Sequence, residues 1–322
     1  MLEEGSSVIL RDAGGFCRVV AKLEGKTLYR VGRMNVAGNF LFSRRWGETI
    51  AQSGSEWMRC RPTRILGAGE GFGDSSEPEN DKEDDLPSRA ESAALNSSTF
   101  SDKTRFSQEK YLLKKHKKYS KEITLLEPTI PLLCELSQVI HWDAIALLLR
   151  LGNTRGKVLI YDDATGLAVA AFLQRGSHVT RIVASKGSKS YKSVQDLGIK
   201  CNANPNLQEL RLSDDKLSKD SFNSFVCVFT GNAPGVTLDT LIDKGIDMLS
   251  DECGNFALYV RHFEEASAWQ KKLRTYKIFL NVNMTEILTR EHQIMPDRTH
   301  PLMQSSVQLL QGFIVSAFKV KL

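Results

Sequence analysis

The residues best placed to do chemistry follow an apolar stretch, Lys157–Tyr161, that is typical of a buried strand. The chain continues Asp162-Asp163-Ala164-Thr165-Gly166-Leu167-Ala168 into a predicted helix over residues 166–174. A strand-to-helix turn holds a cofactor when an acid and closely spaced glycines let the backbone approach it. Against a pattern such as G-T-G-S-G, Ala164 and Ala168 replace two of the three glycines, and Leu167 replaces a small residue.

The end of the second predicted strand of this region, 179–184, also lacks a residue type that cofactor binding needs. An acid there would accept hydrogen bonds from ribose hydroxyls, yet the chain reads Ser185-Lys186-Gly187, and the nearest acid downstream is Asp196. Together these departures predict that no cofactor binds. The alternative is that Asp162 or Asp163 still serves and that Gly166 suffices.

The net charge of +5 combines two opposite blocks that nearly adjoin. From Lys103 to Lys121, eight basic residues and one acid give a local charge of +7. From Glu70 to Ser92, nine acids and two bases give −7. A hypothesis follows that residues 74–85 fold back and screen the lysines, although a spacer kept soluble by its charge is the simpler interpretation.

The basic block predicts a helix over 104–120 whose cations contact phosphate groups. The candidate contacts there are Lys103, Arg105, Lys110, Lys114, Lys115, Lys117 and Lys118. Tyr111 and Tyr119 either pack beneath this helix or stack on a base. The other interpretations of the block are a solvated helix face and a nuclear localisation signal.

The elements that must position these residues fall into two groups. Near the N-terminus, short strands at 7–10, 16–20 and 26–31, separated by Gly-containing turns, predict a small antiparallel sheet or barrel. Residues 67–98 are rich in Gly, Ser, Glu and Asp and predict a disordered acidic linker. A strand at 123–126, after the basic helix, returns toward the first group.

From Trp142 onward, strands and helices alternate, which predicts an α/β, doubly wound Rossmann-like sheet of the class I methyltransferase type with a degenerate cofactor site. The closing strand pair, 277–282 and 312–319, supports that type by fold analogy. The predicted domains are a β-rich, barrel-like domain at 1–66, the linker at 67–98, the basic helix and return strand completing the first domain at 99–130, and the Rossmann domain at 131–322.

Cysteine, histidine and apolar patterns argue against a metal site, a secretory signal and a membrane span. The six cysteines form no CxxC pair and lie among apolar residues, which predicts reduced core thiols. No histidine pair has metal-ligand spacing. The acidic start Met1-Leu2-Glu3-Glu4 lacks the features of a signal peptide, and no apolar run is long enough to span a bilayer.

Three segments carry a resemblance to a known family. They are Asn96–Tyr111 with the basic run Lys114–Tyr119, the segment from Trp142-Asp143 through Leu151–Arg155, and Met295–Pro301 followed by Gly312-Phe313. On these the chain resembles the non-catalytic subunits of the eukaryotic tRNA (adenine-58-N1)-methyltransferase. The N-terminal strands match only weakly, and the region from about 187 to 224 is shorter than is usual in the family.

The resemblance implies an N-terminal β-barrel, a methyltransferase-like domain without a working S-adenosylmethionine site, and a location in the nucleus. It also implies that the chain binds tRNA and assembles with a catalytic subunit as a heterodimer that pairs into a heterotetramer. In the segment Asp297–Pro301 it implies that Arg298 contacts tRNA or the partner, with Asp297 and His300 shaping the loop.

Three functions remain open at this point. The leading hypothesis is a non-catalytic, tRNA-binding subunit. The alternatives are an active single-chain S-adenosylmethionine-dependent RNA methyltransferase and a nuclear RNA-binding scaffold with a degenerate Rossmann domain.

Overall fold

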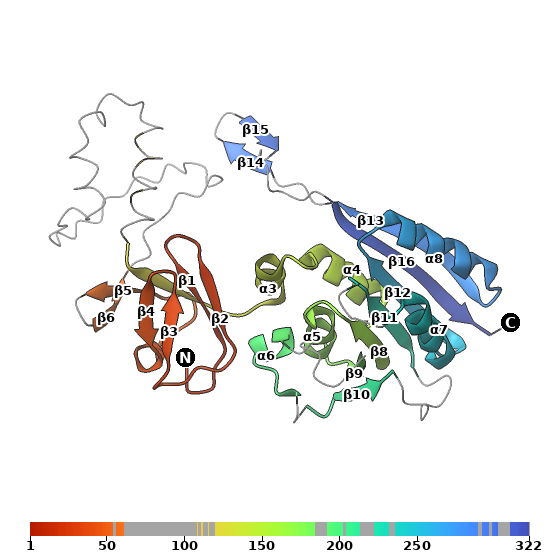
Figure 1. Ribbon diagram of the computed structural model, residues 1–322, viewed down its shortest axis with the longest axis horizontal. Helices are drawn as coiled ribbons and strands as arrows, with labels where there is room; N and C mark the ends of the chain where they lie inside the picture. The colour runs from red at the N-terminus through yellow and green to blue at the C-terminus, as the bar shows by residue number, and fades with distance from the viewer. Residues whose placement is uncertain are drawn as a thin grey trace. The chain divides into compact units, whose positions relative to one another are not determined.

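The computed structural model forms two compact units (Figure 1). One comprises residues 1–127 and 291–303, and the other comprises residues 128–290 and 304–322. The residues described are 1–53, 56–60, 108, 111, 115, 120–183, 192–201, 204–212, 222–231, 236–288, 292–295, 298–301 and 310–321. The predicted acidic linker at 67–98 and most of the predicted basic helix lie outside these ranges.

The first unit is built on a five-stranded antiparallel sheet, which confirms the predicted β-rich domain. Its strands, in spatial order, are β2 (Cys17–Val20), β1 (Val8–Asp12), β7 (Glu122–Leu126), β5 (Thr49–Ser53) and β6 (Glu56–Cys60). A hairpin of β3 (Leu28–Val31) and β4 (Met34–Ala37) precedes a 3-10 helix, η1 (Gly38–Leu41). Side chains from sheet and hairpin share one core, in which Leu10, Tyr29 and Ile123 are buried.

The return strand β7 lies in the middle of this sheet, between β1 and β5. Ile123 and Leu125 are fully buried, whereas the side chains that alternate with them are partly exposed, as expected for a strand with one face on the core. The sheet therefore depends on a strand that follows β6 in sequence by about sixty residues.

A seven-stranded sheet forms the second unit. The strands, in spatial order, are β10 (Leu207–Arg211), β9 (His178–Val183), β8 (Lys157–Asp162), β11 (Ser224–Val228), β12 (Glu252–Val260), β16 (Leu310–Val320) and β13 (Phe279–Leu288). The first five are parallel, and β16 runs antiparallel to both neighbours. This order confirms the predicted doubly wound, methyltransferase-type sheet.

Helices cover both faces of the sheet (Figure 1). The helices are α3 (Ile130–Ser137), α4 (Trp142–Leu151), α5 (Leu167–Gln174), α6 (Lys192–Asp196), α7 (Leu238–Met248) and α8 (Phe263–Thr275). On one face, side chains of α7 and α8 such as Ile242 and Trp269 share a hydrophobic core with Tyr161, Phe225 and Phe256 of the sheet. On the other face, α3, α4 and α6 all contact α5.

Some elements were not predicted. Helix α3 begins with Thr129, whose side chain accepts a hydrogen bond from the amide of Leu132, and has a proline in its first turn. Both are start signals that the sequence contains. Strand β10 buries only Leu210, so its apolar pattern is too weak to indicate a strand. A hairpin of β14 (His292–Met295) and β15 (Arg298–Pro301) also went unpredicted.

The thiols are only partly buried, which corrects the prediction of core cysteines. All six are free, yet only Cys134 and Cys227 are buried and Cys253 is exposed. Burial raises the pKa of Cys134 to about 12, with smaller contributions from Asp162 and Glu135. Among the described residues, no helix is long and apolar enough to cross a membrane, and no group of three or more His, Cys, Asp or Glu side chains is arranged to hold a metal ion.

A buried cation, Lys319 of β16, stabilises the end of α7. Its ammonium group donates to the carbonyl oxygens of Ile246 at 2.8 Å and Leu249 at 2.7 Å, and lies 2.9 Å from the carboxylate of Asp251. The last carbonyls of a helix lack partners within the helix and carry partial negative charge. Lys319 therefore joins the C-terminal end of α7 to the antiparallel strand β16.

We expect Lys319→Met to lower the free energy of unfolding by about 2–4 kcal/mol, because buried carbonyls and a carboxylate lose a charged donor. Urea unfolding followed by tryptophan fluorescence measures this loss. The exposed Lys321, changed to Met, is the matched control and should shift stability by less than about 0.5 kcal/mol. Equal effects of the two changes would contradict the role of Lys319.

Candidate functional site

The point where a fold of this type binds ligands lies at the carboxyl ends of β8 and β11. Strand order reverses there, because β8 is flanked by β9, which follows it in the chain, and by β11, which comes later. Crevices at such a switch point hold cofactors in open α/β sheets. In this chain the switch point is formed by Asp162 at the end of β8, the loop 163–166, and the first turn of α5.

The carboxyl group of Asp162 is fully occupied by its own loop. Only 2% of the residue is exposed. Oδ1 accepts from the amide of Ala164 at 3.0 Å, and Oδ2 accepts from the amide of Ala168 at 2.9 Å. Burial raises the pKa of Asp162, while these two amides and the nearby Arg181 oppose that increase. The group therefore holds the loop against the start of α5.

Asp163, the second acid, is also committed to the chain itself. One of its oxygens accepts from the backbone amide of Thr230 at 2.7 Å and from the hydroxyl of Thr230 at 2.8 Å. Thr230 follows β11, so Asp163 joins the ends of the two strands that flank the switch point. Both carboxyl groups already stabilise local structure, which argues against the hypothesis that either acid binds a cofactor.

The positions that need glycine are filled. Leu167 is fully buried and Ala168 is 1% exposed, so the first turn of α5 packs into the protein. Gly166 alone keeps the left-handed backbone, with φ of +82°. Free amides at a helix start are what bind the anionic part of a ligand, and here the amide of Ala168 already donates to Asp162.

The neighbouring strand β9 places a cation beside this site. Arg181 is 1% exposed and lies in register with Ile160 of β8. It is close enough to Asp162 to lower that group's pKa. Lys186, which stands near the position where an acid for the ribose hydroxyls is expected, lies outside the described residues. Asp196, at the end of α6, is buried, and burial raises its pKa, so it is not presented to a ribose.

These contacts do not fit S-adenosylmethionine. Asp162 is paired with the amide of Ala168 and Asp163 with Thr230, two required glycines are absent, and a leucine fills the first turn. The hydroxyl of Thr165 is buried without a hydrogen-bond partner among the described residues, but one hydroxyl does not replace the missing glycines.

The predicted RNA-binding residues are only partly described. Lys103, Arg105, Lys110, Lys114, Lys117 and Lys118 lie outside the described residues. Gln108, Tyr111 and Lys115 are helical and spaced by three and four residues, so they share one helix face. The ammonium group of Lys115 lies 5.2 Å from the ring centroid of Tyr111. Tyr111 is half-buried, and whether it packs beneath the helix or stacks on a base stays a prediction.

Arg298 begins strand β15, where its backbone pairs with Met295 of β14. The hairpin lies in the connection between β13 and β16. The side chain of Arg298 is not described, so its contact with tRNA or a partner stays a prediction.

Comparisons with known proteins agree with this architecture. The Gcd10p family matches residues 91–285, which is more than half of the chain. The chain is 23% identical over 296 residues to the tRNA (adenine(58)-N(1))-methyltransferase non-catalytic subunit of Dictyostelium discoideum, covering 70% of this chain and 56% of that protein. It is 38% identical over 90 residues to the subunit of the same name from Mus musculus, covering 25% of this chain and 18% of that protein. The chain thus spans about half, or less, of these relatives' lengths.

Solved structures show the same fold at low identity. An S-adenosylmethionine-dependent O-methyltransferase from Thermotoga maritima has a TM-score of 0.64 and 12% identity, over 100% of this chain and 95% of that one. A tRNA (m1A58) methyltransferase from Aquifex aeolicus has a TM-score of 0.57 and 15% identity, over 100% and 99%. These likenesses concern the fold alone.

We expect the isolated chain to bind S-adenosylmethionine no more tightly than a Kd of about 1 mM, because its loop amides and acids are already paired. Isothermal titration calorimetry measures this, with an active methyltransferase of the same fold as positive control. Saturable binding with a Kd of tens of micromolar would contradict the assignment of Asp162 and Asp163 to local structure.

Proposed function

The chain belongs to the Gcd10p family, and on this premise we propose that it is the non-catalytic, tRNA-binding subunit of a complex that methylates N1 of adenosine 58 in tRNA. The observation that carries the proposal is the family match over 91–285, which includes both the basic block and the altered loop after β8. The relatives named above are non-catalytic subunits of such a methyltransferase.

The contacts at the end of β8 support a non-catalytic role. A methyl donor has to be held before its methyl group can move, and Asp162 instead closes the loop that would hold it. The catalytic partner would supply the cofactor and the base that accepts the proton. This chain would contribute RNA contacts and the fold that the partner recognises.

The basic block supports tRNA binding, because each neutralised phosphate releases counterions. The proposed contacts are Lys103, Arg105, Lys110, Lys114, Lys115, Lys117, Lys118 and Arg298. The cation of Lys115 remains half-exposed above Tyr111, so it can meet a phosphate while its stem covers the ring.

An exposed apolar pair on the second unit supports assembly with a partner. Leu280 of β13 and Phe318 of β16 lie opposite each other in register, and 53% and 41% of their surfaces are exposed. Leu288, at the far end of β13, is 66% exposed. Exposed apolar side chains on the edge strand of a sheet and on the strand beside it are typical of an interface. The proposed assembly is a heterodimer that pairs into a heterotetramer.

Co-expression with the candidate catalytic chain separates this proposal from its alternatives. Size exclusion with light scattering gives the stoichiometry, and a tRNA methylation assay gives the activity of the complex and of each chain alone. The proposal expects activity only in the complex. Methylation by this chain alone would indicate a single-chain enzyme, and RNA binding without complex formation would indicate a scaffold. A nuclear location is part of the proposal, and imaging a fluorescent fusion tests it.

Changing Lys114, Lys115, Lys117 and Lys118 to Ala should weaken tRNA binding at least about tenfold at physiological salt and lower the slope of log K against log salt by up to about four. Fluorescence anisotropy with labelled tRNA, over a salt series, measures both quantities. A charge-matched control changes four exposed lysines elsewhere, Lys157, Lys200, Lys271 and Lys321. If both quadruple variants bind tRNA like the parent chain, the basic block is not the contact.

We expect Leu280→Glu to prevent co-purification with the catalytic chain, because a charge would be buried opposite Phe318 at the interface. The fold should persist, since the side chain is exposed in this chain alone. Phe16→Glu, at a 54% exposed position in the first unit, is the control. Normal co-purification of the Leu280 variant would place the interface elsewhere.

A further inference from the structure

Two adjoining cavities lie on the first unit, with volumes of about 590 Å³ and 400 Å³. Glu48 and Arg59 line both of them, so together they form one groove. Arg45 and Trp46 line the larger cavity, and Arg44 and Phe42 line the smaller one. We call this the Arg45–Arg59 groove. Its lining residues belong neither to the basic block at 103–121 nor to the loop after β8.

The backbone that carries the groove is held by the core sheet. The amide of Gly47 donates to the carbonyl of Leu125 at 2.6 Å, and the amide of Leu125 donates to the carbonyl of Glu48 at 2.9 Å. Gly47 has φ of +88°, which turns the chain sharply between Trp46 and Glu48. Because both bonds go to the central strand β7, the side chains beside Gly47 project from a fixed turn.

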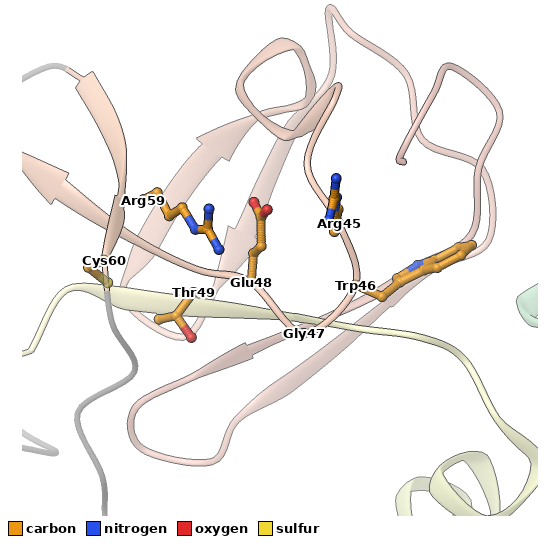
Figure 2. A pocket seen from close by; sticks show the side chains of 7 residues that line it. All are labelled: Arg45, Trp46, Gly47, Glu48, Thr49, Arg59 and Cys60. Carbon is orange, nitrogen blue, oxygen red and sulfur yellow. The ribbon is translucent and has the colours of Figure 1, made fainter.

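Three charged side chains of the groove, Arg45, Glu48 and Arg59, have no partner among the described residues, whereas Arg44 donates to the carbonyl of Trp57 at 3.4 Å. Figure 2 shows the carboxylate of Glu48 between the side chains of Arg45 and Arg59. Within the part of the chain that the structure describes, neither guanidinium group has a hydrogen bond or ion pair, and neither has the Glu48 carboxylate. The two guanidinium groups are therefore available to a ligand. A planar guanidinium group can donate two parallel hydrogen bonds to the oxygens of a phosphate.

Trp46 adds a flat apolar surface at one end. Its ring nitrogen donates to the carbonyl of Ser7 at 3.4 Å, which fixes the ring by one edge, and 42% of the residue stays exposed. A tryptophan anchored by its edge offers its face to a planar ligand. In the smaller cavity, Phe42 and the amide side chain of Asn39 add an aromatic surface and a donor–acceptor pair.

We propose that the Arg45–Arg59 groove binds unstacked nucleotides of the tRNA, with phosphates on Arg45 and Arg59 and a base on Trp46. This rests on the proposed function and adds a second contact site to it. Single-stranded RNA is recognised by this combination of arginines and aromatic faces, with acceptors for the donors on bases and ribose. Glu48 is such an acceptor. An acidic peptide fits less well, because its carboxylate side chains offer Trp46 no planar base to stack on.

The test measures tRNA affinity of the full chain and of R45Q/R59Q over a salt series. Loss of two phosphate contacts should weaken binding about tenfold and lower the salt slope by about two. The control is R11Q/R33Q, which removes the same charge from exposed arginines of the same unit outside the groove. Both variants should unfold at the temperature of the parent chain, because none of the four side chains is buried.

Photo-crosslinking to tRNA containing 4-thiouridine identifies the site directly. The proposal expects a crosslinked peptide that contains Trp46, and loss of that crosslink in R45Q/R59Q. If the parent chain binds tRNA and R45Q/R59Q matches R11Q/R33Q in affinity and crosslinks, the groove is not an RNA site although the proposed function stands. If the parent chain binds no tRNA, alone or with its catalytic partner, both the function and the groove assignment fail.

Discussion

The buried carboxyl group of Asp162, at the end of β8, holds the loop that leads into α5. The helices on one face of the second unit pack on α5. Moving a carboxyl group out of water is costly unless donors replace the water, and here two loop amides do so, while the charge of the buried Arg181 lowers the pKa of the carboxyl group. The loop held by Asp162 starts α5, a helix buried from Leu167 to Leu173. Helices α3, α4 and α6 each pack on α5. The interaction that removes a ligand site is thus also the one from which this helical layer is built.

Sequence patterns predict strands correctly where a strand is buried along its length. Strands such as 157–161 and 225–229 have every central side chain in the core, so their apolar runs are unambiguous. The loss of glycines in the loop after β8 can also be read from the sequence, because it depends only on neighbouring residues. What the sequence could not supply was the pairing of Asp163 with Thr230, which depends on two residues far apart in the chain meeting at adjacent strand ends. The cation of Arg181, in the middle of a strand, escaped attention for the same reason.

The groove on the first unit shows a further limit of sequence reading. Arg45, Trp46 and Arg59 are ordinary surface types with no distinctive spacing, and they converge only because β5 and β6 form a hairpin beside the turn at Gly47. The run of charges at 103–121, by contrast, is apparent from the sequence. Sites assembled from scattered single residues need the topology before their chemistry can be seen.

The position of β7 has a consequence for how the first unit tolerates change. Strands β6 and β7 belong to one sheet with only β5 between them, so the segment from 61 to 121 begins and ends at fixed points close together. The entropy lost on closing such a segment grows with the logarithm of its length, about 0.6 kcal/mol for each doubling. Insertions and deletions within it therefore cost the sheet little, whereas a shift of one residue in β7 would turn Ile123 and Leu125 out of the core. Relatives should accordingly differ most in the length of the part of this segment that precedes the basic block, while keeping the alternation of β7 unchanged.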